Sequence, residues 1–278
     1  GVSWWKNSMT EPRRWIGSLM LGLPGPLRAL RNVPVLGNLI HRLSHQIVPA
    51  DEKVWARVEN GPGKGLWLEL NPRTGQHYLR GEVEPKVQAI LAENLKPGMV
   101  FYDLGANIGF FSLLAARLVG TTGKVFSFEP DREVAGRLRR NIAKNNFSNV
   151  TVIEAGIWSR SGNVNFVAAD LSSPDRGVGR FTSAEDPALG MPTRCVSLDD
   201  FTRDASIPGA IKCDVEGAEV EAFRGAQGLI ETHMPWILCE MHSEANDRFL
   251  RKYFGDHEYA VQSVDELHVL AMPQSAKQ

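Results

Sequence analysis

The sequence is poor in cysteine and has neither an excess of charge of one sign nor a long hydrophobic run. Its 278 residues include three cysteines, Cys195, Cys213 and Cys239, which are too few and too scattered for a disulfide framework or a zinc-binding pair. The 31 basic and 32 acidic residues leave a net charge of −1, which argues against general binding to nucleic acid backbones. We therefore expect a cytoplasmic protein that acts on a small or neutral substrate, without a nucleic acid partner.

The first 50 residues contain no segment that is typical of a membrane span. Residues 15–27 are uncharged, but Pro24 and Pro26 interrupt them, and they fall short of the ~20 apolar residues that a spanning helix needs. Further on, apolar residues recur at helical spacing from Leu36 to Ile47. This stripe predicts a helix docked on its own domain. The alternative is a helix that contacts a membrane surface, a lipid-linked substrate or a partner subunit in an oligomer.

The chain divides into three predicted parts. Residues 1–50 form a helical appendage. Alternating apolar residues over 54–70 predict a β-hairpin, and Pro85 suits the first turn of a lead-in helix, so residues 51–96 form the second part. In residues 97–278 short apolar strands alternate with helices, the pattern of a parallel sheet with crossover helices. We therefore expect an α/β fold with a Rossmann-like, mostly parallel seven-stranded sheet.

The boundaries of the predicted elements follow from the apolar runs. We expect core strands at 99–104, 124–128, 150–155, 210–214 and 236–241, and helices that begin near Gly109, Asp131, Gly217 and Glu244. Two last strands, 259–264 and 267–271, predict an antiparallel hairpin. An insertion at about 159–206 is predicted to hold strands at 163–168 and 193–198, a substrate-covering loop between them, and a short helix capped by Asp199 and Asp200.

A candidate cofactor loop follows the first core strand. That strand ends in Asp103, and a loop with Gly105, Asn107 and Gly109 leads into a helix, where α/β sheets bind adenosine cofactors. The spacing is not the dinucleotide pattern G-x-G-x-x-G, and an acid before the loop would repel a pyrophosphate. An acid suits a cationic sulfonium ligand. An NAD-type oxidoreductase and a non-catalytic binding module are the alternatives.

The ends of the next strands extend this predicted cofactor site. Glu129 and Pro130 end the second strand, where a carboxylate accepts hydrogen bonds from ribose hydroxyls. Ala155 and Gly156 follow the third strand, where the adenine is expected. Glu84 precedes the lead-in helix and is expected to close over the other end of the cofactor, although helix capping explains this acid as well.

Acidic residues and a histidine follow the fourth and fifth core strands. Asp214, Glu216 and Glu219 come after the fourth strand, and Glu240 and His242 end the fifth, so we expect them at the same sheet edge as the cofactor loop. Helix capping is the structural interpretation of Asp214 and Glu216, and a plain surface position is that of His242. The crowded acids would repel each other unless a metal or a cationic ligand lies between them, which favours a functional interpretation.

Four segments together carry a family resemblance, over roughly residues 78–242: Phe101–Gly109, Phe128–Pro130, Asn141 with Asn145-Asn146, and above all Ile211–Glu219. With these segments the sequence resembles the FkbM family of methyltransferases. The resemblance implies a class I methyltransferase fold and transfer of a methyl group from S-adenosylmethionine to an oxygen. The acceptor it implies is a hydroxyl of a sugar, a glycolipid or a polyketide-like secondary metabolite. Cys213 stands where the family often has an aliphatic or other small residue.

The acceptor hydroxyl needs a general base or a divalent metal, since an alkyl hydroxyl is a poor nucleophile. In one hypothesis Asp214 and Glu240, at the ends of neighbouring strands, bind magnesium or manganese, and His242 acts as base or orienter. In the other hypothesis the site is free of metal. His242 then removes the proton, and Asp214 and Glu216 bind substrate hydroxyls.

Overall fold

The structure of the protein is a computed structural model that describes residues 52–167, 180–181 and 190–274. These residues fall into two compact units, 52–83 and 84–274. The predicted N-terminal helix and most of the loop in the predicted insertion lie outside the described residues. No helix within the described ranges is long and apolar enough to cross a membrane. The predicted division of the chain at 50/51 and 96/97 stays a prediction.

The first unit contains the predicted β-hairpin. β1 (Val54–Arg57) pairs antiparallel with β2 (Trp67–Leu70), and the apolar side chains that alternate along both strands are buried. A short helix that the sequence pattern does not predict, α4 (Gln76–Arg80), follows and ends at Gly81 with a φ of 72°. Five residues are too few to show a helical apolar stripe, which is why the pattern misses this helix.

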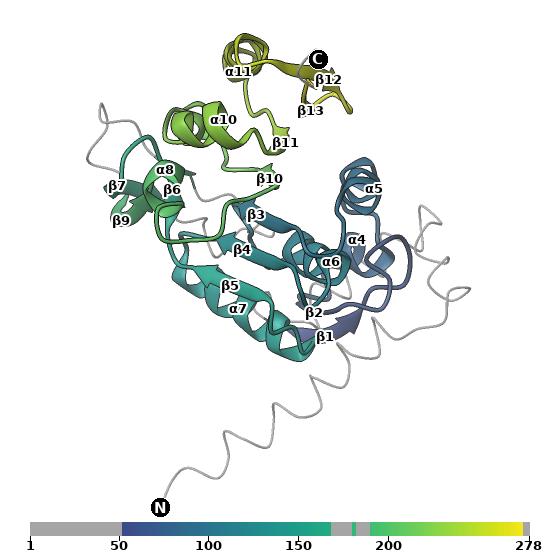
Figure 1. Ribbon diagram of the computed structural model, residues 1–278. Helices are drawn as coiled ribbons and strands as arrows, with labels where there is room; N and C mark the ends of the chain where they lie inside the picture. The colour runs from purple at the N-terminus through teal and green to yellow at the C-terminus, as the bar shows by residue number, and fades with distance from the viewer. Residues whose placement is uncertain (1–51, 168–179, 182–189, 275–278) are drawn as a thin grey trace, which may run out of the picture. The chain divides into compact units, whose positions relative to one another are not determined.

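The central sheet of the second unit has seven strands in the order β12-β13-β11-β10-β3-β4-β5, which Figure 1 shows from yellow to teal. β13 is antiparallel to β11 and β12, and the pairs among β11, β10, β3, β4 and β5 are parallel. The predicted Rossmann-like α/β fold with its C-terminal antiparallel hairpin is confirmed. The strands are β3 (Val100–Leu104), β4 (Lys124–Phe128), β5 (Val150–Ile153), β10 (Ala210–Cys213), β11 (Trp236–Glu240), β12 (Tyr259–Ser263) and β13 (His268–Pro273).

Helices cover both faces of this sheet. On one face α6 packs against β3 and β4, α5 packs against α6, and α7 packs against β5. The other face carries α8, α9, α10 and α11, whose apolar side chains share one core with the strands. The helices are α5 (Pro85–Asn94), α6 (Phe110–Val119), α7 (Arg132–Lys144), α8 (Leu198–Phe201), α9 (Glu219–Arg224), α10 (Gln227–His233) and α11 (Glu244–Asp256).

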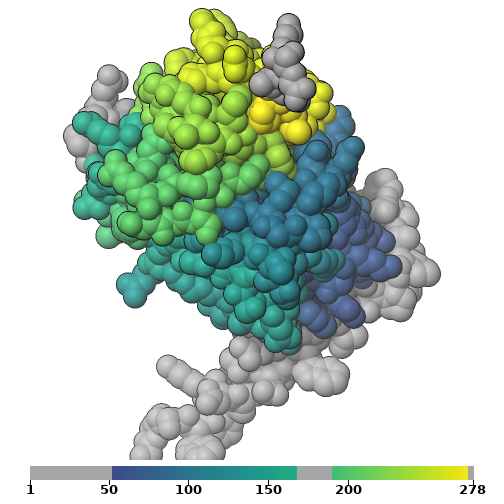
Figure 2. Space-filling model, viewed as in Figure 1, coloured from purple at the N-terminus to yellow at the C-terminus, as the bar shows by residue number. Residues whose placement is uncertain are grey.

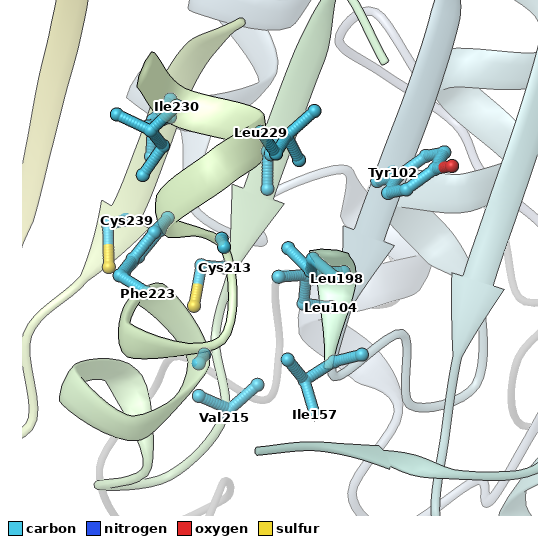
Figure 3. Close-up of a cluster of buried hydrophobic side chains, with 14 of the residues drawn as sticks. Tyr102, Leu104, Ile157, Leu198, Cys213, Val215, Phe223, Leu229, Ile230 and Cys239 are labelled. Atoms are coloured by element: carbon cyan, nitrogen blue, oxygen red, sulfur yellow. The ribbon is translucent and has the colours of Figure 1, made fainter. Parts of the chain in front are cut away.

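The core under α9 and α10 fixes the strands that carry the predicted acidic residues. Figure 3 shows Phe223 of α9 and Leu229 of α10 gathered with Cys213 and Cys239 of the adjacent strands β10 and β11. Cys213 and Cys239 are paired in the parallel register of the sheet, and both are fully buried. Figure 2 shows a closely filled outer surface over the green and yellow part of the chain. The segments that follow Cys213 and Cys239 therefore start from a rigid base.

Three strands of the predicted insertion form, with β6 just before it, a separate four-stranded sheet in the order β6-β9-β7-β8. Its strands are β6 (Gly156–Ile157), β7 (Gly162–Val167), β8 (Arg180–Phe181) and β9 (Met191–Val196). The expectation that Asp199 and Asp200 cap the short helix is wrong. Ser197 caps α8, and the Asp199 carboxylate accepts hydrogen bonds from the backbone N–H groups of Gly228 and Leu229, at the start of α10. The reason is that α8 packs against α10, a long-range contact that no local pattern reveals.

Candidate functional site

Two glycines of the loop after β3 have the positive φ that favours glycine, but contacts with neighbouring parts of the chain explain why glycine is needed there. Gly105 has a φ of 78°, and a Cβ at this position would lie 1.7 Å from the carbonyl oxygen of Asp214. Gly109 has a φ of 91°, and a Cβ there would lie 2.1 Å from Leu138. Both glycines are thus required by close packing of this chain. Contact of the loop with a cofactor remains a prediction.

Asn107 and Glu129 join the first two strand ends. Asn107 has a φ of 50°, which is unusual for a residue with a side chain, and its backbone N–H donates to Oε2 of Glu129 at 2.9 Å. Oε1 of the same carboxylate accepts from the N–H of Asp131. Burial raises the pKa of Glu129 to about 7. A ribose that donates to this buried carboxylate would favour its ionised form, so Glu129 fits the predicted cofactor role.

Asp103 belongs to β3, just before the loop, and its side chain is buried. One of its oxygens accepts from Ser112 of α6 at 2.5 Å, and the other is buried without a hydrogen-bond partner among the described residues. Burial raises the pKa of Asp103. An unpaired buried carboxylate oxygen is costly, so this atom suits a ligand or water that donates a hydrogen bond.

The other predicted cofactor residues occupy more ordinary positions. Pro130 lies between Glu129 and Asp131, whose side chain caps α7. Ala155 is fully buried in the core, so only its backbone is available to an adenine. Gly156 belongs to β6 and pairs with Cys195 of β9.

The acidic residues after β10 and β11 gather around one histidine. Nε2 of His242 lies 3.1 Å from Glu216, 3.6 Å from Asp214 and 3.8 Å from Glu240. Nδ1 of His242 lies 2.7 Å from Oε1 of Glu219. We call these five residues the His242 cluster. The structure thus brings together all four residues predicted to be catalytic, Asp214, Glu216, Glu240 and His242.

Helix capping does not explain this cluster. α9 begins at Glu219, two residues later than expected, and no side chain caps its N-terminus. Asp214 and Glu216 instead face His242, and Glu216 has a φ of 52°. A left-handed conformation at a residue with a side chain is typical of functional sites.

A buried lysine, Lys212, neutralises part of this acidic edge. Its side chain is 3% exposed, and Nζ donates to Asp214 Oδ2 at 3.1 Å. The parallel register places Lys212 opposite Asp103, and the ammonium group also lies over the Phe111 ring. Burial opposes the charge of Lys212, but Asp214, Glu84 and Asp103 outweigh it and raise the pKa. Lys212 lies within the family segment Ile211–Glu219, but its position opposite Asp103 is known only from the register of the sheet.

His242 is the second internal cation. Burial alone would lower the pKa of His242, but Glu216 and Glu219 outweigh that effect and raise it to about 11. The imidazole is therefore doubly protonated at neutral pH. Lys212 and His242 thus place two positive charges beside the crowded acids, and the predicted metal ion stays a prediction.

A second histidine, which the sequence reasoning missed, borders the cluster. Nε2 of His268 lies 3.3 Å from Glu84 and 3.6 Å from Oε2 of Glu240, and Nδ1 lies 2.8 Å from Asp265. Glu84 therefore lies at this edge, and its contact with a cofactor stays a prediction. Its side chain does not cap α5, although Glu84 occupies the N-cap position. The sequence signal that could have identified His268 is a histidine at the start of an apolar strand.

Two groups of side chains at this edge have the chemistry of a metal site. Asp214, Glu240 and His242 form one group, and Glu84, Glu240 and His268 form the other. In each group one ligand atom per residue lies within 4.8 Å of the others. Glu240 is common to both groups.

A pocket of about 860 Å³ lies elsewhere in the second unit. Its walls include Phe126 of β4, Thr151 of β5, Arg194 of β9 and Phe201 of α8, and it contains none of the predicted site residues. It extends to Lys124, the first residue of β4, and so toward the amino ends of the strands, opposite the His242 cluster.

Residues 103–264, more than half of the chain, match the family model of the methyltransferase FkbM domain. The chain belongs to the FkbM methyltransferase family. The family match and the strand order of the central sheet together identify a class I methyltransferase fold, and the family implies S-adenosylmethionine as the cofactor. The matched residues include the loop after β3 and the His242 cluster, whereas Glu84 and His268 lie outside them.

Individual relatives are distant from this FkbM chain. Hexuronic acid methyltransferase AglP of Haloferax volcanii is 24% identical over 180 residues, which are 64% of this chain and 70% of AglP. Protein-L-isoaspartate O-methyltransferase of Methanococcoides burtonii is 34% identical over 71 residues, 25% of this chain and 35% of that protein.

Solved structures with a similar chain path are also distant in sequence. The FkbM methyltransferase of Methylobacillus flagellatus KT aligns with a TM-score of 0.48 and 16% identity, over 95% of this chain and 59% of that chain. This chain thus spans less than two thirds of that protein. Fibrillarin of Aeropyrum pernix, solved with S-adenosylmethionine, aligns with a TM-score of 0.42 and 14% identity, over 80% of this chain and 83% of that chain.

Proposed function

We propose that this chain transfers a methyl group from S-adenosylmethionine to a hydroxyl oxygen of a sugar, a glycolipid or a sugar-like secondary metabolite. One observation carries the proposal: the His242 cluster lies at the carboxyl ends of β10 and β11, beside the loop that follows β3. In α/β sheets this edge is where ligands bind. The AglP relative, named as a hexuronic acid methyltransferase, supports a sugar acceptor.

The cofactor residues in this proposal are Asp103, Asn107 and Glu129, with the backbone around Gly105 and Gly156. When bound, S-adenosylmethionine supplies an electrophilic methyl group. Glu129 would accept hydrogen bonds from the ribose, and the unpaired oxygen of Asp103 would accept one from the ligand or from a bridging water.

The acceptor hydroxyl loses its proton as the oxygen–carbon bond forms, and a group of the chain must receive that proton. His242 is already protonated, so we assign this task to the carboxylates of Asp214, Glu216 and Glu240. His242 holds these carboxylates in place and is itself held by the buried Glu219. This assignment replaces His242 as the base and needs no metal.

The pH dependence of turnover separates the two assignments. Burial opposes the charge of Asp214, but Lys212 outweighs it and lowers the pKa of this carboxyl, so with Asp214 as base the rate constant for methyl transfer should be nearly constant over pH 6–8.5. A histidine base acts only when it is deprotonated, so the rate would rise with pH toward the pKa of His242. Exhaustive chelation provides the parallel test of the metal hypothesis, since activity that returns with magnesium or manganese would restore Asp214 and Glu240 as metal ligands.

The charge of the edge favours an uncharged acceptor ring. The acids Asp214, Glu216, Glu219 and Glu240 outnumber the cations Lys212 and His242 by four to two. Carboxylates bind sugar hydroxyls as acceptors, whereas a uronate needs arginine or lysine donors. Both of these cations, Lys212 and His242, are already paired with acids of the cluster. This chain therefore differs in expected acceptor from a methyltransferase of hexuronic acids.

The decisive experiment is a transfer assay with isotope-labelled methyl groups and a panel of neutral glycosides, matched glucuronides and glycolipids. Transfer of label to a hydroxyl of a neutral glycoside is the expected result. Calorimetric titration with S-adenosylmethionine and with NAD tests the alternatives. Binding of NAD alone would indicate an oxidoreductase, and S-adenosylmethionine binding with no transfer to any acceptor would indicate a non-catalytic module.

A further inference from the structure

His268, the second histidine beside the His242 cluster, is the first residue of β13. The antiparallel register of β11 and β13 places His268 directly opposite Glu240. The His268 side chain is 5% exposed, and that of Glu240 is 17% exposed. Residues paired across antiparallel strands hold their side chains within contact distance, so this pair is fixed by the backbone.

The His268 ring has a defined orientation because Asp265 holds its Nδ1 atom. Asp265 Oδ1 lies 2.8 Å from Nδ1 and also accepts from the backbone N–H groups of Leu267 and His268. A ring fixed at Nδ1 must direct Nε2 toward Glu84 and Glu240. His242 is arranged in the same way, with Glu219 at Nδ1 and Nε2 toward the acids.

Glu240 lies between these two anchored histidines. Its Oε1 lies 3.8 Å from Nε2 of His242, and its Oε2 lies 3.6 Å from Nε2 of His268. Each oxygen faces a different imidazole at ion-pair distance, outside hydrogen-bond range, and this arrangement favours one orientation of the carboxylate. Loss of His268 would release one oxygen and let the carboxylate rotate away from His242.

We propose that His268 is a positioning residue that, held by Asp265, keeps Glu240 oriented toward His242. Its effect on catalysis rests on the proposed function, while the coupling of the two histidines through Glu240 does not. His268 lies outside residues 103–264, which match the FkbM family model.

The first test reads the coupling without any acceptor. In the full chain with ¹⁵N-labelled histidine, His268→Gln is expected to shift the ring nitrogen resonances of His242, and Glu240→Gln to shift those of both histidines. The matched control is His257→Gln. His257 also has an oxygen 2.7 Å from Nδ1 and an acid near Nε2, but it ends α11, and its change should leave His242 unaffected.

A His242 spectrum that is unchanged in folded His268→Gln would overturn the proposal. If that variant does not fold, Asp265→Asn serves instead, since it keeps the size of the anchor and removes its charge. His242 resonances that do not move in Asp265→Asn would be equally decisive.

The second test uses methyl transfer to an acceptor from the panel. His268→Leu should lower kcat roughly ten- to a hundredfold, because a misdirected group near the reacting atoms costs about that much. S-adenosylmethionine affinity should stay unchanged, and His268→Gln, which keeps a donor, should recover part of the loss. If the variants shift the His242 resonances but the wild-type protein shows no transferase activity, the positioning of Glu240 by His268 stands and the proposed function is refuted. The two failures are therefore distinguishable.

Discussion

Glu219 is fully buried beneath His242, and both of its oxygens are used. Oε1 accepts from the N–H of Gly217 and lies 2.7 Å from Nδ1 of His242, while Oε2 accepts from Asn246 at 2.5 Å. A buried carboxylate with three donors is a fixed support for the imidazole. The orientation of His242 thus originates in α9 and α11 rather than in β11, which ends two residues before it.

Glu219→Gln tests this support. The amide places a donor against one of the three existing donors, so we expect a loss of about 1–3 kcal/mol in the free energy of unfolding, measured by urea denaturation. Methyl transfer should fall as well, because His242 loses its anchor. The control is Glu221→Gln on the same helix, which affects only an ion pair with Arg224 and should cost under about 1 kcal/mol. Equal losses in the two variants would contradict the role of Glu219.

Gly105→Ala tests whether packing within the chain requires the loop glycine. A Cβ at position 105 would overlap the Asp214 carbonyl oxygen at 1.7 Å, and the backbone φ of 78° is already unfavourable for alanine. Gly98 has a similar φ of 87°, and the nearest described atom to a Cβ there would be Thr122 Oγ1, at an ordinary contact distance of 3.7 Å. We therefore expect Gly98→Ala to cost about 1 kcal/mol and Gly105→Ala clearly more, by chemical denaturation. Equal costs would mean that backbone strain alone explains Gly105.

Much of the fold follows from local patterns. Short apolar runs placed all seven strands of the central sheet, and Asp131 and the glycines marked the ends of helices. α4 was missed because of its length, and α10 because it directly follows α9. Neither helix has an apolar stripe of its own long enough to detect.

The site residues that could be predicted from the sequence are those that directly follow a recognisable strand. Asp214, Glu216, Glu240 and His242 follow predicted strands and meet as expected. Lys212 and His268 were missed because their partners come from strand register, Lys212 opposite Asp103 and His268 opposite Glu240. Their charges offer internal ion pairs as a second explanation of the crowded acids, and the metal site stays a prediction.

Glu129 predicts a pH-dependent affinity for S-adenosylmethionine. Burial raises the pKa of Glu129 to about 7 in the ligand-free protein, and ribose hydroxyls would donate to the ionised form. Calorimetric affinity should therefore increase as the pH rises from 6 to 8, by up to about tenfold. In Glu129→Gln the affinity should be lower and nearly independent of pH over this range. A wild-type affinity that does not change with pH would remove Glu129 from the cofactor site.

The two histidines predict the direction in which stability depends on pH. In the folded chain, acids raise the pKa of His268 to about 10 and that of His242 to about 11, against an ordinary value of 6.5. A raised pKa means that the folded state holds the proton more tightly than the unfolded state does. The resulting stabilisation is complete below pH 6.5 and is lost as the pH rises toward about 10 for His268 and about 11 for His242.

The free energy of unfolding should therefore decrease between pH 6.5 and 9, with each histidine contributing at most about 1.4 kcal/mol per pH unit. Urea denaturation at several pH values measures this slope. His268→Leu should make this slope smaller, because the variant loses the contribution of His268 and keeps that of His242. His257→Gln serves as the matched control and should keep the wild-type slope. A wild-type stability that rises with pH over this range would show that His268 and His242 are neutral in the folded protein, and Lys212 would then be left as the cation beside these carboxylates.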